Sequence, residues 1–397
     1  MHFEYAIVGG GIVGLGTALA LQEQGVRSLV VLEAEDRVAA HQTGNNSGVI
    51  HAGVYYRPGS LKAKLCAEGR QALYAFCEEE GIAHDRCGKL IVAGSEAERA
   101  RLDALAERAQ ANGLTPKRLT ASELRDYEPH VAGVAGLWIA ETGIVDYRAV
   151  AAAYARRVRE HGGEIRTSWR LANVRRKPEH LTLISTHDEA ITCAQLITCA
   201  GLQADRVARL CGVEPGVRIT PFRGEYYELT PDARHLVRNL IYPVPNPSFP
   251  FLGVHFTRKI DGSIEAGPNA VLAFKREGYR KSSFSLRDSL DVFGYPGFWR
   301  LATRYWRTGV GEFYRSYSKY AFWRALRVLV PAIEAQHLHP AGAGVRAQAL
   351  APDGQLVDDF HIVRGYRMTH VLNAPSRAAP ASLSIGRYIA QTSSQLI

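Results

Sequence analysis

A glycine-rich turn near the amino terminus constrains the fold more than any other stretch of this sequence. Residues 3–8 form a short apolar run, which ends in Gly9-Gly10-Gly11-Ile12-Val13-Gly14 before a second apolar stretch over residues 15–21. This order predicts a strand, a turn and a helix, with three glycines in the spacing G-x-G-x-x-G. Gly9 makes the tight turn, Gly11 lets the backbone approach a pyrophosphate, and Gly14 lets the helix pack on the strand. The phosphate then lies at the start of the helix, near Ile12 and Val13.

A carboxylate occurs where a dinucleotide-binding unit requires one. Residues 28–32 form a second apolar strand that ends at Glu33, about 20 residues after the glycines. A carboxylate at this point accepts hydrogen bonds from ribose hydroxyls and repels a 2′-phosphate, so the sequence favours FAD or NAD(H) over NADP. The alternative is a structural strand-helix-strand turn with a solvated Glu33.

Composition predicts a globular protein with one large core or two domains. The chain has 397 residues, of which 22% are charged and 46% hydrophobic. No run approaches the roughly 18 unbroken apolar residues of a membrane-spanning helix. The glycine turn begins so close to Met1 that no signal peptide fits before it, so we expect a cytoplasmic location. Six cysteines without C-x-x-C spacing predict buried thiols and no metal site.

The formal charge of +9 leaves three kinds of partner open: nucleic acid, an anionic membrane surface, or an anionic substrate. The charge is concentrated in residues 293–330. Between Asp291 and Glu334 the only acidic residue is Glu312, against seven Arg or Lys and twelve aromatic residues. Helices of this kind can cap their own domain, lie in a membrane interface or stack RNA bases. Apolar residues at helical spacing favour the first two, so we expect no nucleic acid partner.

The loop over residues 41–56 is rich in glycine, hydroxyl and amide side chains. Because it follows the second strand directly, we expect it at the edge of the sheet where the nucleotide lies. The alternative is an ordinary surface loop. With Ala34, which follows Glu33, the candidate cofactor contacts here are Thr43, Gly44, Asn45, Asn46, Ser47 and Gly48.

The remaining pattern predicts an α/β fold in which a Rossmann-like nucleotide-binding domain carries a mixed-sheet, α+β substrate domain. Residues 61–81, 97–112 and 146–161 have helical periodicity, residues 193–201 end like a further parallel strand, and residues 217–275 alternate like an antiparallel sheet. We expect residues 1–87, 147–216 and 335–397 in the nucleotide domain, and residues 88–146 and 217–334 in the substrate or cap domain. The other candidate cofactor contacts are Val174, Ala200, Gly201, Gly344, Asn373, Ala374, Pro375 and Ser376.

Several motifs make the chain resemble the D-amino-acid-oxidase-like FAD oxidoreductases, and within them the L-2-hydroxyglutarate dehydrogenase/oxidase family. The most specific are Asn46-Ser47-Gly48-Val49-Ile50-His51-Ala52-Gly53, Cys87-Gly88-Lys89-Leu90, Pro221-Phe222-Arg223-Gly224-Glu225 and Gly342-Ala343-Gly344-Val345-Arg346-Ala347-Gln348. The resemblance implies FAD as cofactor, a 2-hydroxy dicarboxylate as substrate, 2-oxoglutarate as product, and a quinone or O2 as electron acceptor. Peripheral contact with the cell membrane through residues 293–330 fits a quinone acceptor.

The chain departs from the family pattern at three positions. It has Asn45 where the family has His, and Arg377 and Pro380 where the family has Pro and Thr. An asparagine at residue 45 can neither bond to flavin through an imidazole nor act as a base. Pro380 suits the first turn of a helix.

Oxidation of a 2-hydroxy acid needs a group that holds the carboxylate and a base that takes the hydroxyl proton, while the hydride goes to flavin N5. Arg346 is the candidate for the carboxylate because its planar fork pairs bidentately, and a surface salt bridge is the alternative. His51 is the candidate base, with His255 in reserve, although a histidine in a glycine-rich loop is often a structural hydrogen bonder. The candidates for a second carboxylate are Tyr55, Arg223, Tyr226 and Thr257.

Three other functions remain open from the sequence. An amine oxidase of the glycine or sarcosine type would share the FAD scaffold and the arginine. An RNA-binding flavoprotein would use residues 293–330, and a nucleotide-binding scaffold would have no activity.

Overall fold

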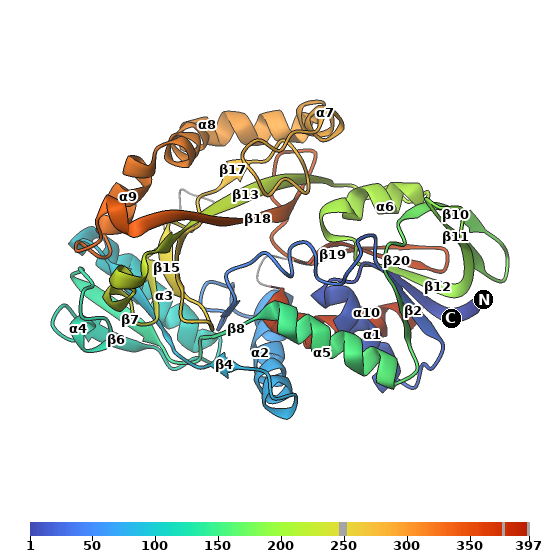
Figure 1. Cartoon of the computed structure of the whole chain (residues 1–397), viewed down its shortest axis with the longest axis horizontal. Helices are drawn as coiled ribbons and strands as arrows, with labels where there is room; N and C mark the ends of the chain where they lie inside the picture. The colour runs from blue at the N-terminus through green and yellow to red at the C-terminus, as the bar shows by residue number, and fades with distance from the viewer. Residues whose placement is uncertain (246–251, 375–377, 395–397) are drawn as a thin grey trace.

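The computed structural model describes residues 1–245, 252–374 and 378–394 of the chain. Two large sheets form two lobes, and the long strands β13 and β18 run from the second lobe toward the first (Figure 1). A small sheet of β3 (Val49–Ile50), β8 (Gly143–Val145) and β4 (His84–Asp85) joins segments that are distant in the sequence.

Among the described residues the first sheet has eight strands, which come from amino-terminal, central and carboxyl-terminal segments of the chain. Its strands are β1 (His2–Val8), β2 (Leu29–Leu32), β9 (Glu164–Arg166), β10 (Leu171–Arg176), β11 (Leu181–Ser185), β12 (Ala190–Thr198), β19 (His361–Gly365) and β20 (Met368–Asn373). β1 pairs in parallel with β2 and with β12, and β12 pairs in parallel with β20. This confirms that residues 193–201 hold another parallel strand of the nucleotide sheet and that the carboxyl-terminal segment returns to it.

Helices cover one face of this sheet. They are α1 (Ile12–Glu23), α2 (Leu61–Glu79), α5 (Tyr147–Glu160) and α10 (Ser382–Ser394), while α6 (Ala204–Leu210) packs against β20. Alternation along β1 sends Tyr5 and Ile7 into the helical core. α1 and α10 touch through glycines, because a Cβ on Gly16 would lie 2.7 Å from Ser382 O and one on Gly386 would lie 2.3 Å from Gly16 O.

Within the described part of the chain the second sheet has nine strands. They are β5 (Lys89–Ala93), β6 (Lys117–Thr120), β7 (Ala135–Ile139), β13 (Arg218–Leu229), β14 (Leu240–Pro243), β15 (His255–Arg258), β16 (Ile264–Gly267), β17 (Val271–Leu272) and β18 (Leu338–Leu350). The antiparallel prediction for residues 217–275 is confirmed for the described pairs within that segment, and β14 also pairs in parallel with β5, which lies outside it. β18 pairs along β13 in this sheet, so residues 338–350 lie in the second sheet, although the sequence assigned residues 335–397 to the nucleotide domain.

Helices also cover this second sheet on both faces. α3 (Glu96–Ala111) packs with Ile91 and Ala93, and α9 (Lys319–Arg327) packs with Leu90 and Val92 on the other side. The remaining helices are α4 (Leu124–Tyr127), α7 (Leu286–Phe293) and α8 (Pro296–Tyr317), and α8 is interrupted at Tyr305.

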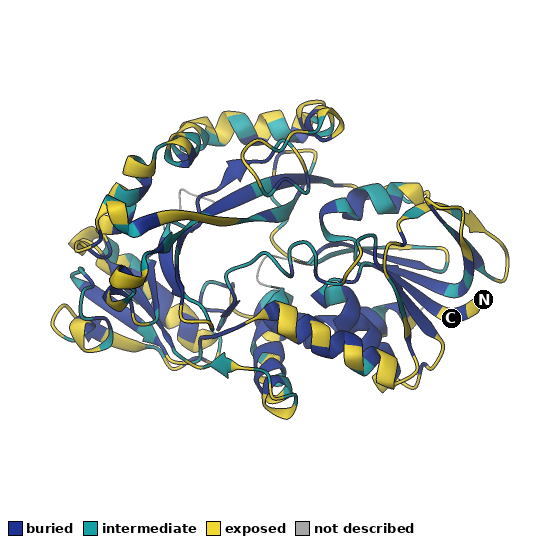
Figure 2. Ribbon diagram, in the orientation of Figure 1, coloured by how far each residue is buried: buried dark blue, intermediate teal, exposed yellow. Residues whose placement is uncertain are grey.

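α7, α8 and α9 form one outer edge of the molecule, where exposed positions alternate with partly buried ones (Figure 2). Among the described residues, eleven of the fourteen exposed large hydrophobic side chains fall between residues 284 and 328. We call this set the aromatic edge: Phe284, Leu286, Leu290, Phe293, Trp299, Trp306, Val310, Tyr314, Tyr317, Tyr320 and Val328. In the described part of the chain no helix is both long and apolar enough to cross a membrane.

Candidate functional site

A cavity of about 900 Å³ extends from the first sheet to the second. Its walls include Val8, Leu32 and Asn373 at the carboxyl ends of parallel strands, which is the side on which open α/β sheets bind ligands. Tyr226 and His255 of the second sheet line it as well. One cavity thus joins the predicted nucleotide site and the predicted substrate site.

The glycine turn forms the base of this cavity. Gly9 has a φ of +113°, and a Cβ on it would lie 2.3 Å from Cys199 O of β12's following turn. A Cβ on Gly14 would lie 2.0 Å from Gly9 O, so this glycine permits helix and strand to pack, as predicted. Gly11 is the N-cap of α1 and has no side chain to accept from the helix amides. The start of α1 is therefore a place where a phosphate fits closely.

Glu33 lies at the end of β2 and lines the cavity although its residue is only 8% exposed. Its carboxylate accepts hydrogen bonds from the Gly10 amide at 2.7 Å and from the Glu35 amide at 2.9 Å. These two bonds fix the carboxylate beside the glycine turn. A carboxylate held in this way fits the ribose that the sequence predicts here.

The loop after Ala34 closes over the start of α1. Thr43 accepts from the Ile12 amide at 3.0 Å, the Asn45 side chain donates to His41 O at 2.8 Å, and the Asn46 side chain donates to Thr43 O at 2.6 Å. These bonds hold the loop in one conformation. The side-chain amide of Asn45 therefore helps to hold this loop. The predicted residues that line the cavity are Gly9, Gly11, Ile12, Val13, Glu33, Ala34, Thr43, Asn45, Asn46, Ser47, Ala200, Gly201, Gly344, Asn373 and Ala374.

Four predicted cofactor contacts do not line the cavity. Gly14, Gly44 and Gly48 instead allow close packing, since a Cβ on Gly44 would lie 2.4 Å from Ala39 O and one on Gly48 2.8 Å from Val145 O. Val174 packs in the apolar layer behind the first sheet, whereas Leu171 of the same strand lines the cavity. Pro375, Ser376 and Arg377 lie outside the described residues, and Pro380 lines the cavity.

The substrate end is a chamber of aromatic and basic side chains. Arg346 on β18 and Tyr226 on β13 line it, and burial raises the pKa of the Tyr226 phenol while the Arg346 charge opposes that shift. On β14 and β15 of the same sheet, the Tyr242 ring lies against His255 at a tilt of 32° with centroids 3.8 Å apart, and His51 meets Tyr242 edge-on at 6.5 Å. Arg346, His51, His255, Tyr55 and Tyr226 therefore all line the same cavity.

Two predicted substrate contacts do not reach this chamber. Strand alternation turns Gly224 and Tyr226 toward the cavity and Arg223 to the opposite face. There Arg223 is buried and donates to Glu225 Oε1 from Nε at 3.0 Å and from Nη2 at 2.8 Å. Thr257 lies two residues beyond His255, about 7 Å along the strand, and is buried outside the cavity wall.

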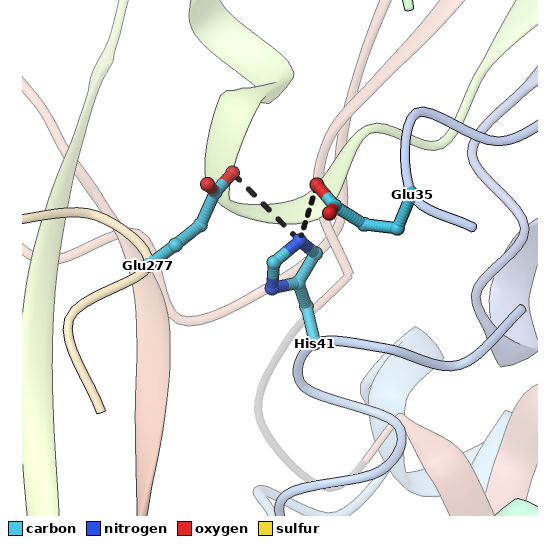
Figure 3. Close-up of side chains that lie close together, drawn as sticks. All are labelled: Glu35, His41 and Glu277. Carbon is cyan, nitrogen blue, oxygen red and sulfur yellow. Dashed lines mark hydrogen bonds and ion pairs between the residues drawn. The ribbon is translucent and has the colours of Figure 1, made fainter. Parts of the chain in front are cut away.

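A histidine between two carboxylates joins the lobes at the other end of the cavity. His41 Nε2 lies 3.2 Å from Glu35 Oε1 and 3.9 Å from Glu277 Oε1 (Figure 3). The ligand atoms of these three residues lie within 4.8 Å of one another, a grouping that the sequence did not predict. Arg170 pairs with Glu35 at 2.8 Å and Gln203 donates to Glu277 at 2.9 Å, so both carboxylates have protein partners.

Sequence reasoning missed several residues of the cavity wall. Tyr242 was not predicted, because an aromatic residue in an apolar strand is typical of the hydrophobic core. Gln42 accepts from the Ala347 amide at 2.7 Å and thereby joins the loop to β18. The end beyond Glu33 is lined by Trp169, Arg170, Leu171 and Thr186, whose scattered positions carry no sequence signal.

Comparison with known proteins places this geometry in a family. A family model described as FAD dependent oxidoreductase matches residues 4–392. The chain is 49% identical over 389 residues to an L-2-hydroxyglutarate dehydrogenase of Indibacter alkaliphilus, with 97% of each chain covered. It is 46% identical to the L-2-hydroxyglutarate dehydrogenase of Escherichia coli K12 (98% of this chain, 92% of the relative). It is 45% identical to the mitochondrial enzyme of that name from Homo sapiens (98% and 88%).

Solved structures agree on the fold. An L-α-glycerophosphate oxidase from Mycoplasma pneumoniae, solved with FAD bound, matches with a TM-score of 0.81 at 22% identity, covering 99% of this chain and 95% of that one. Glycine oxidase from Geobacillus kaustophilus matches with a TM-score of 0.74 at 18% identity and the same coverage.

The residues of this cavity fit FAD. The glycine cradle, the start of α1 and the fixed Glu33 carboxylate fit its adenosine diphosphate half, and the same cavity is lined by Arg346. The chain belongs to the FAD dependent oxidoreductases, and within them to the L-2-hydroxyglutarate dehydrogenase family, with FAD as its cofactor.

Proposed function

We propose that this protein oxidises L-2-hydroxyglutarate to 2-oxoglutarate. The observation that carries the proposal is that Arg346, His51 and His255 share a cavity with the glycine turn and Glu33. The names of relatives at 45–49% identity supply the substrate. FAD, when bound, supplies the acceptor for the hydride that leaves Cα.

Arg346 holds the carboxylate next to the reacting carbon. A guanidinium pairs with a carboxylate through two parallel N–H bonds, which fixes both the position and the rotation of the acid. Tyr226 lies within electrostatic reach of Arg346 and supplies a hydroxyl on the same wall. Together they orient Cα, and orientation lowers the barrier by removing motion before the reaction.

A histidine across the chamber takes the hydroxyl proton as the C–O bond becomes a carbonyl. His255 has the stronger structural support of the two candidates. Its Nδ1 lies 2.8 Å from Gly253 O, so Nδ1 carries the hydrogen and a neutral ring has its lone pair on Nε2. The Tyr242 ring, tilted by 32° against the imidazole with centroids 3.8 Å apart, limits rotation of the imidazole. His51 is the second candidate, and the two are separated experimentally in the Discussion.

We assign FAD binding to the segments of the first sheet, residues 1–87, 147–216 and the part of the tail after β18. The substrate domain then comprises residues 88–146 and 217–350. This division differs from the sequence expectation only in the placement of β18.

We also propose that a membrane quinone accepts the electrons, with O2 as the alternative acceptor. Support comes from the aromatic edge, which concentrates exposed apolar side chains among Arg300, Arg304, Arg307, Arg324 and Arg327. Aromatic rings at headgroup depth with arginines on anionic lipid are typical of helices that lie in a membrane surface. The formal charge of +9 favours the same partner.

Steady-state turnover of the purified flavoprotein with an artificial electron acceptor tests the substrate. L-2-hydroxyglutarate should be oxidised, and D-2-hydroxyglutarate, glycine and sarcosine should not. Oxidation of glycine or sarcosine in place of the hydroxy acid would establish the amine oxidase alternative, which shares this fold.

A further inference from the structure

A lysine is buried in the second sheet beside the substrate chamber. Lys89 is the first residue of β5, and it is 1% exposed. Strand alternation places it on the same face as Ile91 and Ala93, which belong to the apolar layer under α3. An ammonium in such a layer is costly unless neighbouring groups compensate its charge.

Two tyrosines of the chamber wall provide part of this compensation. The Lys89 Nζ lies 4.8 Å from the centroid of the Tyr55 ring and 5.1 Å from that of Tyr242. Both distances are in the range of cation–π attraction. Tyr55 and Tyr242 line the cavity, whereas Lys89 is not among the described residues that do so. The positive charge therefore lies directly behind the wall.

Arg346 provides a positive charge on the chamber wall itself. Tyr226 connects the two regions, because Arg346, Glu265 and Tyr242 all act on its phenol electrostatically. A ligand in this chamber thus has one guanidinium on the wall beside Tyr226 and one ammonium behind Tyr242. Protein between a charge and a ligand screens much less than water does, so the buried ammonium acts across the rings.

We propose that Lys89 is a specificity-determining residue that selects substrates with a second carboxylate, acting through Tyr55 and Tyr242. This inference rests on the proposed function, in which Arg346 holds the first carboxylate. The distal carboxylate of a dicarboxylate then lies against the tyrosine wall and is attracted by the ammonium. A monocarboxylate of the same length gains nothing from that charge.

Binding of unreactive acids to the oxidised flavoprotein tests this assignment independently of turnover. Glutarate and pentanoate have equal chain lengths and differ in the second carboxylate, and each Kd is measured from the perturbation of the flavin absorption band. The wild type should bind glutarate at least about tenfold more tightly than pentanoate. Lys89→Met should remove most of this preference, because it should weaken the binding of glutarate and leave the binding of pentanoate unchanged. The control Lys117→Met removes an exposed lysine from the same sheet and should preserve the preference.

Three outcomes would overturn the proposal: no preference in the wild type, an unchanged preference in Lys89→Met, or equal weakening of both acids, which indicates packing alone. If Lys89→Met does not accumulate as a yellow protein, Lys89→Gln takes its place with the same criteria. A different pair of results would separate the two proposals. If the wild type fails to oxidise L-2-hydroxyglutarate but the Lys89 variant loses the preference for glutarate, the proposed function is refuted and the role of Lys89 is supported.

Discussion

Arg346 is the residue on which substrate orientation depends in the proposed site. Arg346→Lys keeps the positive charge but removes the planar fork, so only one N–H···O bond of the pair can form in the same geometry. We expect kcat/KM for L-2-hydroxyglutarate to fall by about 10-fold to 100-fold, since a charged hydrogen bond contributes about 1.5–3 kcal/mol. The flavin should remain bound, which its visible spectrum checks. Unchanged kinetics would remove Arg346 from the site.

The two histidines of the chamber are separated by paired variants. The base should contribute roughly 10²-fold to 10⁴-fold to the rate of flavin reduction. We expect His255→Asn to show that loss at pH 7 in anaerobic stopped-flow measurements, and His51→Asn to show a smaller one. The reverse order would identify His51 as the base. Full-speed reduction in both variants would exclude a histidine base.

Residue type and motif were sufficient to single out Arg346, His51 and His255, all three of which line the cavity, while their catalytic roles stay predictions. The sequence misplaced Arg223 because it did not reveal which face of β13 meets the cavity. A shift of one residue along a strand reverses the direction of the side chain. Tyr242 was missed for a related reason: only the pairing of β14 with β15 brings it against His255.

The strand β20 contains a histidine that makes stability depend on pH. His370 is buried, its Nδ1 lies 3.0 Å from Thr198 Oγ1, and burial together with the charge of Arg176 lowers its pKa from 6.5 to about 4. As the pH falls below 6.5, the unfolded chain binds a proton that the folded chain does not. The folded state is therefore destabilised progressively between pH 6.5 and pH 4, by about 2 kcal/mol at pH 5.

Urea unfolding of His370→Asn at pH 7.5 and pH 5.0 measures this contribution, because asparagine retains a polar group beside Thr198 but does not titrate. Between the two pH values, the wild type should lose about 2 kcal/mol more than the variant. Equal losses in both proteins would show that His370 is protonated in the fold.

The order of helices and strands could be predicted better than their pairing. Periodicity predicts α2, α3 and α5 to within two residues, since each buries one face in a continuous core. The parallel pairing of β14 with β5 joins residues that are about 150 positions apart, and no local pattern encodes it. The pairing of β18 with β13 in the second sheet could not be predicted for the same reason, because it also joins segments that are far apart in the sequence.

Across the whole molecule, a buried ion pair joins the lobes near the cavity. Arg276, after β17, donates to Leu202 O from Nη1 at 2.8 Å and to Asp205 Oδ2 from Nη2 at 2.9 Å, and neither Arg276 nor Asp205 is exposed. Arg276→Met removes the nearer of two cations beside the buried Asp205 carboxylate and leaves it only Arg209, whose Nη1 lies 3.6 Å from Asp205 Oδ2, so we expect a loss of up to about 3–5 kcal/mol in the free energy of unfolding.

The double variant Asp205→Asn/Arg276→Met removes both charges and should recover most of that loss. Thermal unfolding of Arg276→Met and of the double variant under the same conditions compares their stabilities. A double variant no more stable than Arg276→Met alone would contradict the assignment of the loss to the unpaired charge.

Contact of the whole enzyme with a membrane should depend on the aromatic edge. We expect the wild type to sediment with vesicles that contain anionic phospholipid and less with zwitterionic vesicles, because both apolar contact and arginine charge contribute. Trp306→Ser/Val310→Ser should weaken this binding several-fold, while the control Tyr366→Ser, which alters an exposed aromatic residue on the first lobe, should not. Salt-sensitive retention on RNA without vesicle binding would favour an RNA partner instead.

The central claim is that FAD extends from the glycine turn to Arg346 and accepts a hydride from an L-2-hydroxy acid held there. Anaerobic titration of the purified flavoprotein with L-2-hydroxyglutarate tests it most directly. We predict complete loss of the oxidised flavin spectrum with one 2-oxoglutarate formed per flavin reduced. A preparation that contains bound FAD and keeps its oxidised spectrum in excess L-2-hydroxyglutarate would contradict the account.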